Sequence, residues 1–180
     1  MRKLITVSIL IIVLFSLPKF VLGQEIAGHS AIMSYNYRKD NSIIKRMAIS
    51  QVLTRYNSPL LDQIDSFINS CTNYNLDCYL LPSITGLESS FGQYTYPGSH
   101  NPFGWGGGYI MFETWDKAIN AVAKGLRENY INKGAETVEE IGPIYAESPT
   151  WAVRVQFFKN QFEQEEKQVS LLLGKNSVEL

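Results

Sequence analysis

The fold of this chain is decided by one central stretch, Leu81-Pro82-Ser83-Ile84-Thr85-Gly86-Leu87-Glu88-Ser89-Ser90-Phe91-Gly92. Ile84, Leu87 and Phe91 recur at helical spacing and therefore predict one apolar helix face. Gly92 is typical of the end of a helix. We expect the helix to span residues 77–91.

Glu88 lies on this predicted helix at the edge of the apolar face, four residues after Ile84 and three before Phe91. A carboxyl group against apolar neighbours resists ionisation, so we expect its pKa to be raised. A raised pKa suits a general acid that protonates a glycosidic oxygen. An ordinary solvated carboxylate is the alternative, and the surroundings of Glu88 favour the acid.

Residues 93–108 are dominated by Gly, Pro, Ser and Asn, which predicts a long loop after the helix. A short strand or turn is expected at residues 109–112. Aromatic faces stack well on sugar rings, and the loop carries five aromatic residues, Tyr94, Tyr96, Phe103, Trp105 and Tyr109. Core packing is the alternative for Phe103 and Trp105.

Amphipathic helices are expected on both sides of this region. Apolar periodicity predicts helices over 41–56 and 58–73, and a last helix from Trp151 to about Lys167. Capping residues predict two more helices between them. Thr114 caps the first of these, and a Thr137–Glu140 capping box begins the second. The expected fold class is therefore all-α, with at most a small β element near residues 103–112.

The N-terminus has the pattern of a targeting segment. Arg2 and Lys3 precede an uncharged apolar run at residues 4–17, which is short for a membrane span of about 20 residues. We predict a signal peptide or N-terminal anchor at 1–23, a linker at 24–40, one domain at 41–170 and a tail at 171–180. The domain is expected to be secreted or extracytoplasmic, in the cell envelope.

Composition and charge narrow the classes of partner. The chain is 45% hydrophobic and 18% charged, as in globular domains. Three of its 16 basic residues, and none of its 17 acidic ones, fall within 1–23, so the remainder carries a net charge of about −4. Such a charge disfavours nucleic acid as a partner.

The two cysteines, Cys71 and Cys78, predict a disulfide in an exported protein, with two small buried residues as the alternative. Together with the distant His29 and His100 they form no zinc pattern, so no metal is expected.

The stretch around Glu88 resembles the catalytic helix of the lysozyme-like glycosidases. It is most similar to bacterial endo-β-N-acetylglucosaminidase domains (mannosyl-glycoprotein endo-β-N-acetylglucosaminidase-like) and to related lytic transglycosylases. In these families the glutamate of a Glu-Ser-x-aromatic-Gly element is the acid, which implies that role for Glu88 and a supporting hydroxyl at Ser90. Residues 101–106, Asn-Pro-Phe-Gly-Trp-Gly, resemble the glucosaminidase Asn-x-Phe-Gly segment that lines the cleft beside the acid.

The resemblance covers roughly residues 56–165. Residues 112–126 and the Trp151 helix are similar to the segments that follow in the family. Residues 141–146 resemble a late segment whose tyrosine points at the glutamate, which implies a role for Tyr145. The Gly-Leu-Met-Gln type segment of transglycosylases is missing, and this favours the glucosaminidase branch.

The resemblance implies an exported glycoside hydrolase without a cofactor, acting as a monomer on β-1,4 bonds between N-acetylated amino sugars of peptidoglycan or a related polymer. Nucleic acid is not an expected partner, and a membrane is one only through an uncleaved N-terminal segment. The expected catalytic residues are Glu88 and Tyr145. The expected substrate-binding residues are Ser90, Tyr94, Asn101, Phe103, Gly104, Trp105 and Tyr109.

Several alternatives stay open at this point. The sequence leaves the second catalytic carboxylate open. Glu113 and Asp116 are the candidates, although an ordinary structural role is favoured for both, and a single glutamate can also act alone with water or a group of the sugar. The enzyme class can also be a lytic transglycosylase. A non-catalytic glycan-binding protein, or a structural protein of the cell envelope, on the same fold is the alternative to an enzyme.

Overall fold

The computed structural model describes residues 41–176. The chain divides into two units, Met1–Lys39 and Asp40–Leu180, and the described residues belong to the second. The signal or anchor segment and the linker predicted for residues 1–40 therefore lie outside the described residues. Within residues 41–176 every regular element is a helix, which confirms the prediction of an all-α fold.

The elements follow one another along the chain with short connections, apart from one long loop. Residues 41–55 are helical, as predicted. The elements after them are η1 (Leu61–Gln63, a 3₁₀ helix), α3 (Ile64–Asn73), α4 (Leu80–Ser89), α5 (Trp115–Asn129), η2 (Ile131–Lys133, a 3₁₀ helix), α6 (Val138–Tyr145) and α7 (Trp151–Asn176). The loop at 90–114 contains turns, and the strand considered at 109–112 is not formed.

Helix α3 begins later than the sequence predicts. The Ser58 hydroxyl donates to the carbonyl of Phe91 at 2.7 Å and accepts from the backbone N–H of Leu60 at 3.0 Å. These contacts bind residue 58 to the end of α4, so the chain passes through a 3₁₀ turn before α3 starts at Ile64. Ser58 therefore connects two distant segments instead of capping one long helix.

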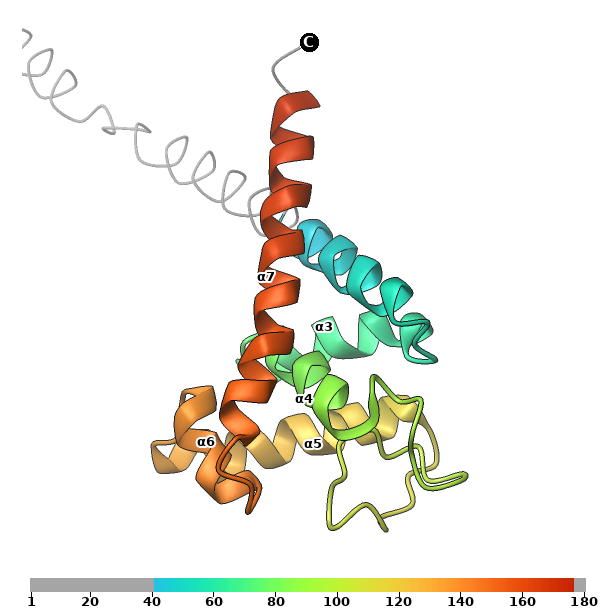
Figure 1. The fold of residues 1–180 in the computed structure, drawn as a ribbon, viewed down its shortest axis with the longest axis vertical. Helices are drawn as coiled ribbons and strands as arrows, with labels where there is room; N and C mark the ends of the chain where they lie inside the picture. The colour runs from blue at the N-terminus through green and yellow to red at the C-terminus, as the bar shows by residue number, and fades with distance from the viewer. Residues whose placement is uncertain (1–40, 177–180) are drawn as a thin grey trace, which may run out of the picture. The chain divides into compact units, whose positions relative to one another are not determined.

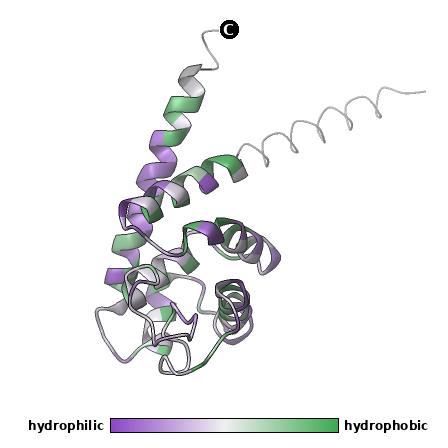
Figure 2. Cartoon of the chain, turned by 90° about the vertical axis from the view of Figure 1, so that its right-hand side faces the viewer, coloured by the Kyte–Doolittle hydropathy of each residue, from purple (hydrophilic) through white to green (hydrophobic). Residues whose placement is uncertain are grey.

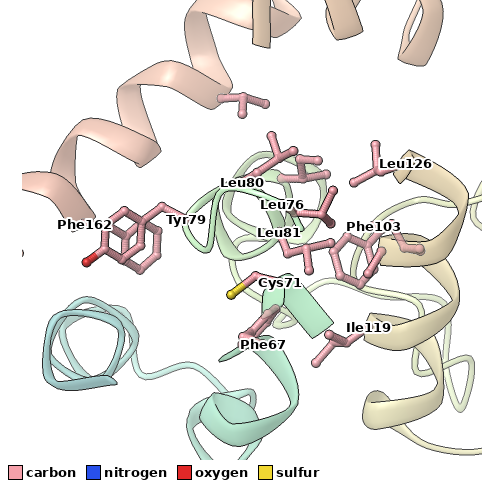
Figure 3. Packing of buried hydrophobic residues seen from close by; sticks show 14 of the residues in the cluster. Phe67, Cys71, Leu76, Tyr79, Leu80, Leu81, Phe103, Ile119, Leu126 and Phe162 are labelled. Atoms are coloured by element: carbon pink, nitrogen blue, oxygen red, sulfur yellow. The ribbon is translucent and has the colours of Figure 1, made fainter. Parts of the chain in front are cut away.

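Helix α4 is buried over nearly its whole surface. Residues 80–86 are all buried, and the polar side chains among them are satisfied within the helix. Ser83 Oγ donates to the carbonyl of Tyr79 at 2.6 Å, and Thr85 Oγ1 donates to that of Pro82 at 2.8 Å. A helix that is covered on all sides lies at the centre of a core. Figure 3 shows Leu80 and Leu81 of α4 in the middle of this packing.

The chain leaves α4 through a left-handed turn. The helix ends at Ser89, and Ser90, Phe91 and Gly92 have φ values of 49°, 58° and 86°. The Phe91 N–H donates to the carbonyl of Thr85 at 2.9 Å, a bond that closes a helix C-terminus. The helix therefore ends two residues before the predicted end at Phe91, because the left-handed turn places the Phe91 ring in the core.

Helix α7 packs across α4 and against α6, while α3 packs against α5 (Figure 1). Hydrophobic and hydrophilic residues alternate along α7, as Figure 2 shows, which fits a helix with one covered face. Helix α7 runs to Asn176, beyond the predicted end near Lys167, so part of the expected tail is helical. No helix within residues 41–176 is both long and apolar enough to cross a membrane.

The predicted caps of α5 and α6 are present. The Thr114 hydroxyl accepts from the backbone N–H of Lys117 at 3.2 Å, at the start of α5. At the start of α6, the Thr137 hydroxyl accepts from the Glu140 N–H at 3.2 Å, and the Glu140 carboxylate accepts from the Thr137 N–H at 2.9 Å. This reciprocal pair is the capping box expected from the sequence.

Cys71 near the end of α3 and Cys78 just before α4 form the predicted disulfide, with their Cα atoms 4.9 Å apart. The cysteines are seven residues apart in the chain, so the bond closes a short loop. It ties the end of α3 to the start of the central helix.

Replacing both cysteines with alanine is expected to lower the free energy of unfolding by about 2 kcal/mol, because the cross-link restricts the unfolded chain. Urea unfolding of both proteins, with and without reductant, measures this effect. The reduced wild type should resemble the double variant, and the variant should not respond to reductant. Equal stability of the oxidised wild type and the variant would contradict the prediction.

Candidate active site

Glu88 lies half-buried in the last turn of α4, where the chain leaves the core for the long loop. Its Oε1 accepts a hydrogen bond from Trp151 Nε1 at 2.7 Å. Its Oε2 faces Gly104 in the loop, where an added Cβ atom would lie 3.2 Å from this oxygen. The two oxygens therefore differ: α7 holds one of them, and the other faces backbone without a side chain.

Burial raises the pKa of Glu88 above its ordinary value of 4.5, in the direction expected from the sequence. The hydrogen bond from Trp151 and the positive charge of Arg154 both act in the opposite direction, and burial outweighs them. Glu88 therefore keeps its proton to a higher pH than an exposed glutamate does.

The loop that faces Glu88 is held by buried polar side chains. The Asn101 amide donates to the carbonyls of Trp105 at 2.9 Å and Ile110 at 3.3 Å, and its oxygen accepts from the Trp105 N–H at 3.0 Å. The Ser89 hydroxyl donates to the carbonyl of Pro102 at 2.7 Å. Together these bonds hold residues 101–110 in place and attach them to the end of α4.

A pocket of about 400 Å³ opens between this loop and the end of α5. It is lined by uncharged residues only: Gly104, Trp105, Gly106, Gly107, Tyr130 and Tyr145. The Trp105 ring is packed against Gly125 of α5, where an added Cβ would lie 2.7 Å from Trp105 Cζ2. Aromatic faces and exposed backbone groups around a small pocket suit a neutral, ring-shaped ligand.

Two other hollows have different chemistry. One of about 700 Å³ runs along the end of α7 and is lined by Glu163, Glu166, Lys167, Ser170 and Leu171. One of about 430 Å³ lies between α6 and the start of α7, with Glu139 and Glu147 at its sides. Among the residues that the structure describes, no aromatic side chain lines either hollow, so the pocket beside Gly104 is the better candidate for a site that binds a ring-shaped ligand.

Tyr145 connects this pocket to the donor that holds Glu88. Its ring stacks on Trp151, with centroids 4.7 Å apart and an interplanar angle of 28°. Its hydroxyl donates to the carbonyl of Phe103 at 2.9 Å, and so it is bonded to the loop instead of to Glu88. Burial, and then the Glu88 charge, raise the pKa of Tyr145 well above its ordinary value, so the phenol stays protonated. Tyr145 therefore positions Trp151 and the loop.

Two predicted substrate-binding residues have structural places instead. Phe103 is fully buried in the core, where Figure 3 shows it near Leu81, so its side chain does not reach the surface of the pocket. The alternative of core packing is the one confirmed, because the turn at residues 102–103 directs the ring inward. Asn101 is also buried, and its amide is occupied by the loop backbone. Gly104 and Trp105, in contrast, line the pocket.

The remaining predicted residues are exposed. Ser90 occupies the left-handed cap of α4, is exposed and makes no hydrogen bond with Glu88 in the structure. Ser89 is the serine that braces the site, because it lies four residues after Thr85 on the buried side of the helix. Tyr94 and Tyr109 are 76% and 77% exposed and do not line the pocket.

Three residues around Glu88 were not expected from the sequence to belong to the site: Trp151, Tyr130 and Arg154. Apolar periodicity in the sequence places Trp151 on the buried face of the last helix. A buried indole N–H needs a hydrogen-bond acceptor, and this requirement is the signal in the sequence that could have predicted a polar partner for Trp151. Arg154 lies three residues after Trp151 and therefore on a similar side of α7.

No second carboxylate accompanies Glu88 among the residues that the structure describes. Glu113 and Asp116 are exposed, and neither forms a hydrogen bond or ion pair with Glu88. Within the same part of the chain, no three His, Cys, Asp or Glu side chains gather as metal ligands would. The candidate site is one carboxyl group beside an uncharged pocket.

Glu88→Gln is expected to stabilise the protein increasingly as the pH rises. Below the ordinary pKa of 4.5, Glu88 is protonated in both the folded and the unfolded state. At higher pH the unfolded chain loses the proton first, so wild-type stability falls as the pH passes through the raised pKa of the folded state. Urea unfolding of both proteins over a pH series measures the difference.

Glu128→Gln, at an exposed carboxylate on α5 that pairs with Lys124 at 3.8 Å, is the matched control. Its difference from the wild type should not show the rise seen with Glu88→Gln. A stability difference for Glu88→Gln that is constant across the pH series would contradict a raised pKa.

Neither a scan against protein-family models nor a search of the curated proteins finds a match to this chain. The family resemblance therefore depends mainly on residues 81–92 and 101–106, and the function has to be inferred from the chemistry of the site.

Proposed function

We propose that the protein is an exported glycoside hydrolase of the lysozyme-like kind. In this proposal it cleaves β-1,4 bonds between N-acetylated amino sugars of peptidoglycan, with Glu88 as the general acid. Residues 1–23 direct the protein out of the cytoplasm. The observation that carries the proposal is the half-buried Glu88, which is bonded to Trp151 and faces a loop that borders an uncharged aromatic pocket.

The different surroundings of the two Glu88 oxygens support an acid with a defined direction. Oε1 accepts the Trp151 hydrogen bond, so it is best suited to be the carbonyl oxygen of the neutral acid. The proton is then carried by Oε2, on the side of Gly104. The missing side chain at Gly104 leaves space there for the oxygen that joins two sugars.

Cleavage starts with transfer of the Oε2 proton to the glycosidic oxygen. The bond from this oxygen to the sugar's anomeric carbon breaks, and its electron pair stays with the leaving sugar. The resulting oxocarbenium-like centre is attacked by water or by a group of the same sugar, and the Glu88 carboxylate takes back a proton. An internal attacking group suits a site with one carboxyl group, since it removes the need for a second.

The uncharged pocket supports a sugar as the ligand. Trp105 and Tyr145 offer ring faces with centroids 5.7 Å apart, and Tyr130 lies 6.3 Å from Trp105. Faces of this kind hold a sugar ring through its apolar C–H side. The glycine backbone at residues 104, 106 and 107 supplies hydrogen-bonding groups without steric obstruction.

Glu88→Gln is expected to reduce release of soluble fragments from purified peptidoglycan by about a hundredfold or more, because an amide is not acidic enough to transfer a proton to the leaving oxygen. The assay counts new reducing ends, and mass spectrometry shows which sugar ends each fragment and whether it is an anhydro form. Glu128→Gln serves as the control and should keep full activity. If the wild type binds the polymer but releases nothing, the protein is a glycan-binding module; if it neither binds nor releases, a structural role remains.

Gly104→Ala is expected to lower kcat/KM by at least about tenfold, because the new methyl group would occupy space beside the proton-carrying oxygen. Gly134→Ala is the matched control: its φ of +95° is also positive, no atom lies within 4 Å of an added Cβ, and it lies after η2, outside the long loop. Both variants carry similar backbone strain, so steady-state kinetics isolates the effect of position. Equal losses in the two variants would show that strain alone is responsible.

A further inference from the structure

Arg154, in the first turn of α7, is an exposed cation that the fold does not use. Within residues 41–176 its side chain forms no ion pair and no hydrogen bond. Other basic side chains of this part of the chain are bound by carboxylates: Lys45, Arg46, Arg55, Lys124 and Lys159. The guanidinium of Arg154 is therefore available to a ligand.

Helical spacing places Arg154 beside the last turn of α4. Trp151, Arg154 and Phe158 follow one another at intervals of three and four residues, so they lie along one side of α7. Trp151 Nε1 donates to Glu88 Oε1 at 2.7 Å. Phe158 Cγ lies 2.9 Å from the position of an added Cβ on Gly86. Both neighbours of Arg154 in this row thus contact the segment of α4 that carries Glu88.

The electrostatics of Glu88 agree with this position. Burial raises the pKa of Glu88, while the Trp151 hydrogen bond and then the positive charge of Arg154 act in the opposite direction. The nearest acidic residue in the chain, Glu147, lines the hollow between α6 and the start of α7 and forms no ion pair with Arg154.

The two sides of Glu88 therefore differ in charge. Residues 89–112, which include the loop that faces Oε2, contain no Lys, Arg, Asp or Glu, and the pocket beside Gly104 is lined by uncharged residues. On the side of α7, Trp151 holds Oε1 and Arg154 supplies a positive charge. A polymer that passes Glu88 meets a neutral wall on one side and a cation on the other.

A guanidinium binds a carboxylate through two parallel hydrogen bonds, which combine charge with a defined direction. Polymers of β-1,4-linked amino sugars differ in exactly this group. A polymer of N-acetylglucosamine alone is neutral, whereas peptidoglycan carries a carboxyl-bearing lactyl ether, free or extended by a peptide, on every second sugar.

We propose that Arg154 is a specificity-determining residue, which binds a carboxylate substituent of the sugar polymer on the α7 side of Glu88. This inference depends on the proposed function for its choice of polymer, and it adds the group that separates the preferred polymer from a neutral one. The contact also sets the register of the polymer, because only every second sugar carries the substituent.

The test measures Kd in the full chain with Glu88→Gln, which leaves the polymer intact and removes the charge through which Arg154 acts on Glu88. The ligands are soluble peptidoglycan strands with peptide stems, strands whose stems an amidase has removed, and both kinds after conversion of their carboxyl groups to amides. Adding Arg154→Gln should raise the Kd of one untreated kind by about tenfold and leave the Kd of the amidated strands unchanged. An effect on strands with stems identifies a peptide carboxylate, and an effect on stripped strands identifies the lactyl carboxylate.

Two further variants separate the charge from its position. Arg154→Lys keeps the charge without the planar fork and should give an intermediate Kd. Lys167→Gln removes the same charge about 20 Å further along α7 and should leave every Kd unchanged. Added salt should weaken binding of the untreated strands by the protein with Arg154 more than by the Arg154→Gln variant.

Equal Kd values for untreated and amidated strands, or no effect of Arg154→Gln on either untreated kind, would overturn the inference. An equal loss of affinity for all ligands would assign Arg154 a structural role and would overturn it as well. If the wild type releases no fragments but the Arg154-dependent preference is present, the carboxylate site is supported and the hydrolase is rejected.

Discussion

The burial of α4 on all sides is the constraint on which the rest of this structure depends. Residues 80–86 have no solvent-facing side, and α7 and α3 pack against this helix. A buried helix can contact solvent only at its ends, and Glu88 is in its last turn. The position of the carboxyl group follows from the packing: it lies close enough to the core to resist ionisation and close enough to the surface to meet a ligand.

The contact between Glu88 and Trp151 joins two elements that are far apart in the chain. The donor and acceptor are 63 residues apart in the chain, and their bond connects the end of α4 to the start of α7. Tyr145 stacks on the indole from α6, and its hydroxyl reaches the loop at Phe103. A half-buried carboxyl group costs stability when it ionises, and this aromatic arrangement limits the number of orientations that it adopts.

The loop after α4 obtains its shape from side chains, because it has no regular structure of its own. Asn101 alone contacts three backbone groups within residues 105–110. Such bracing lets a glycine-rich segment present backbone and aromatic faces while keeping a fixed conformation. Residues 89–112 contain no Lys, Arg, Asp or Glu, which fits the proposed sugar polymer, whose own surface is mostly hydroxyl groups and C–H faces.

The sequence by itself determined the helical class, the capping residues of α5 and α6, and the edge position of Glu88. These features depend on residues within one or two helical turns of each other, and the spacing of residues in the sequence is enough to predict such local contacts. The raised pKa of Glu88 followed from the same local pattern. The disulfide was predictable because its two cysteines are only seven residues apart.

Only the tertiary structure decided which side chains meet Glu88. The pairing with Trp151, the core position of Phe103 and the exchange of roles between Ser89 and Ser90 depend on how distant segments pack. The left-handed turn at Ser90 changes the direction of the chain after α4, and no periodicity in the sequence predicts this turn. The spacing of residues along a helix determines which face of the helix each residue occupies. The residues that pack against that face come from distant parts of the chain, and only the tertiary structure brings them there.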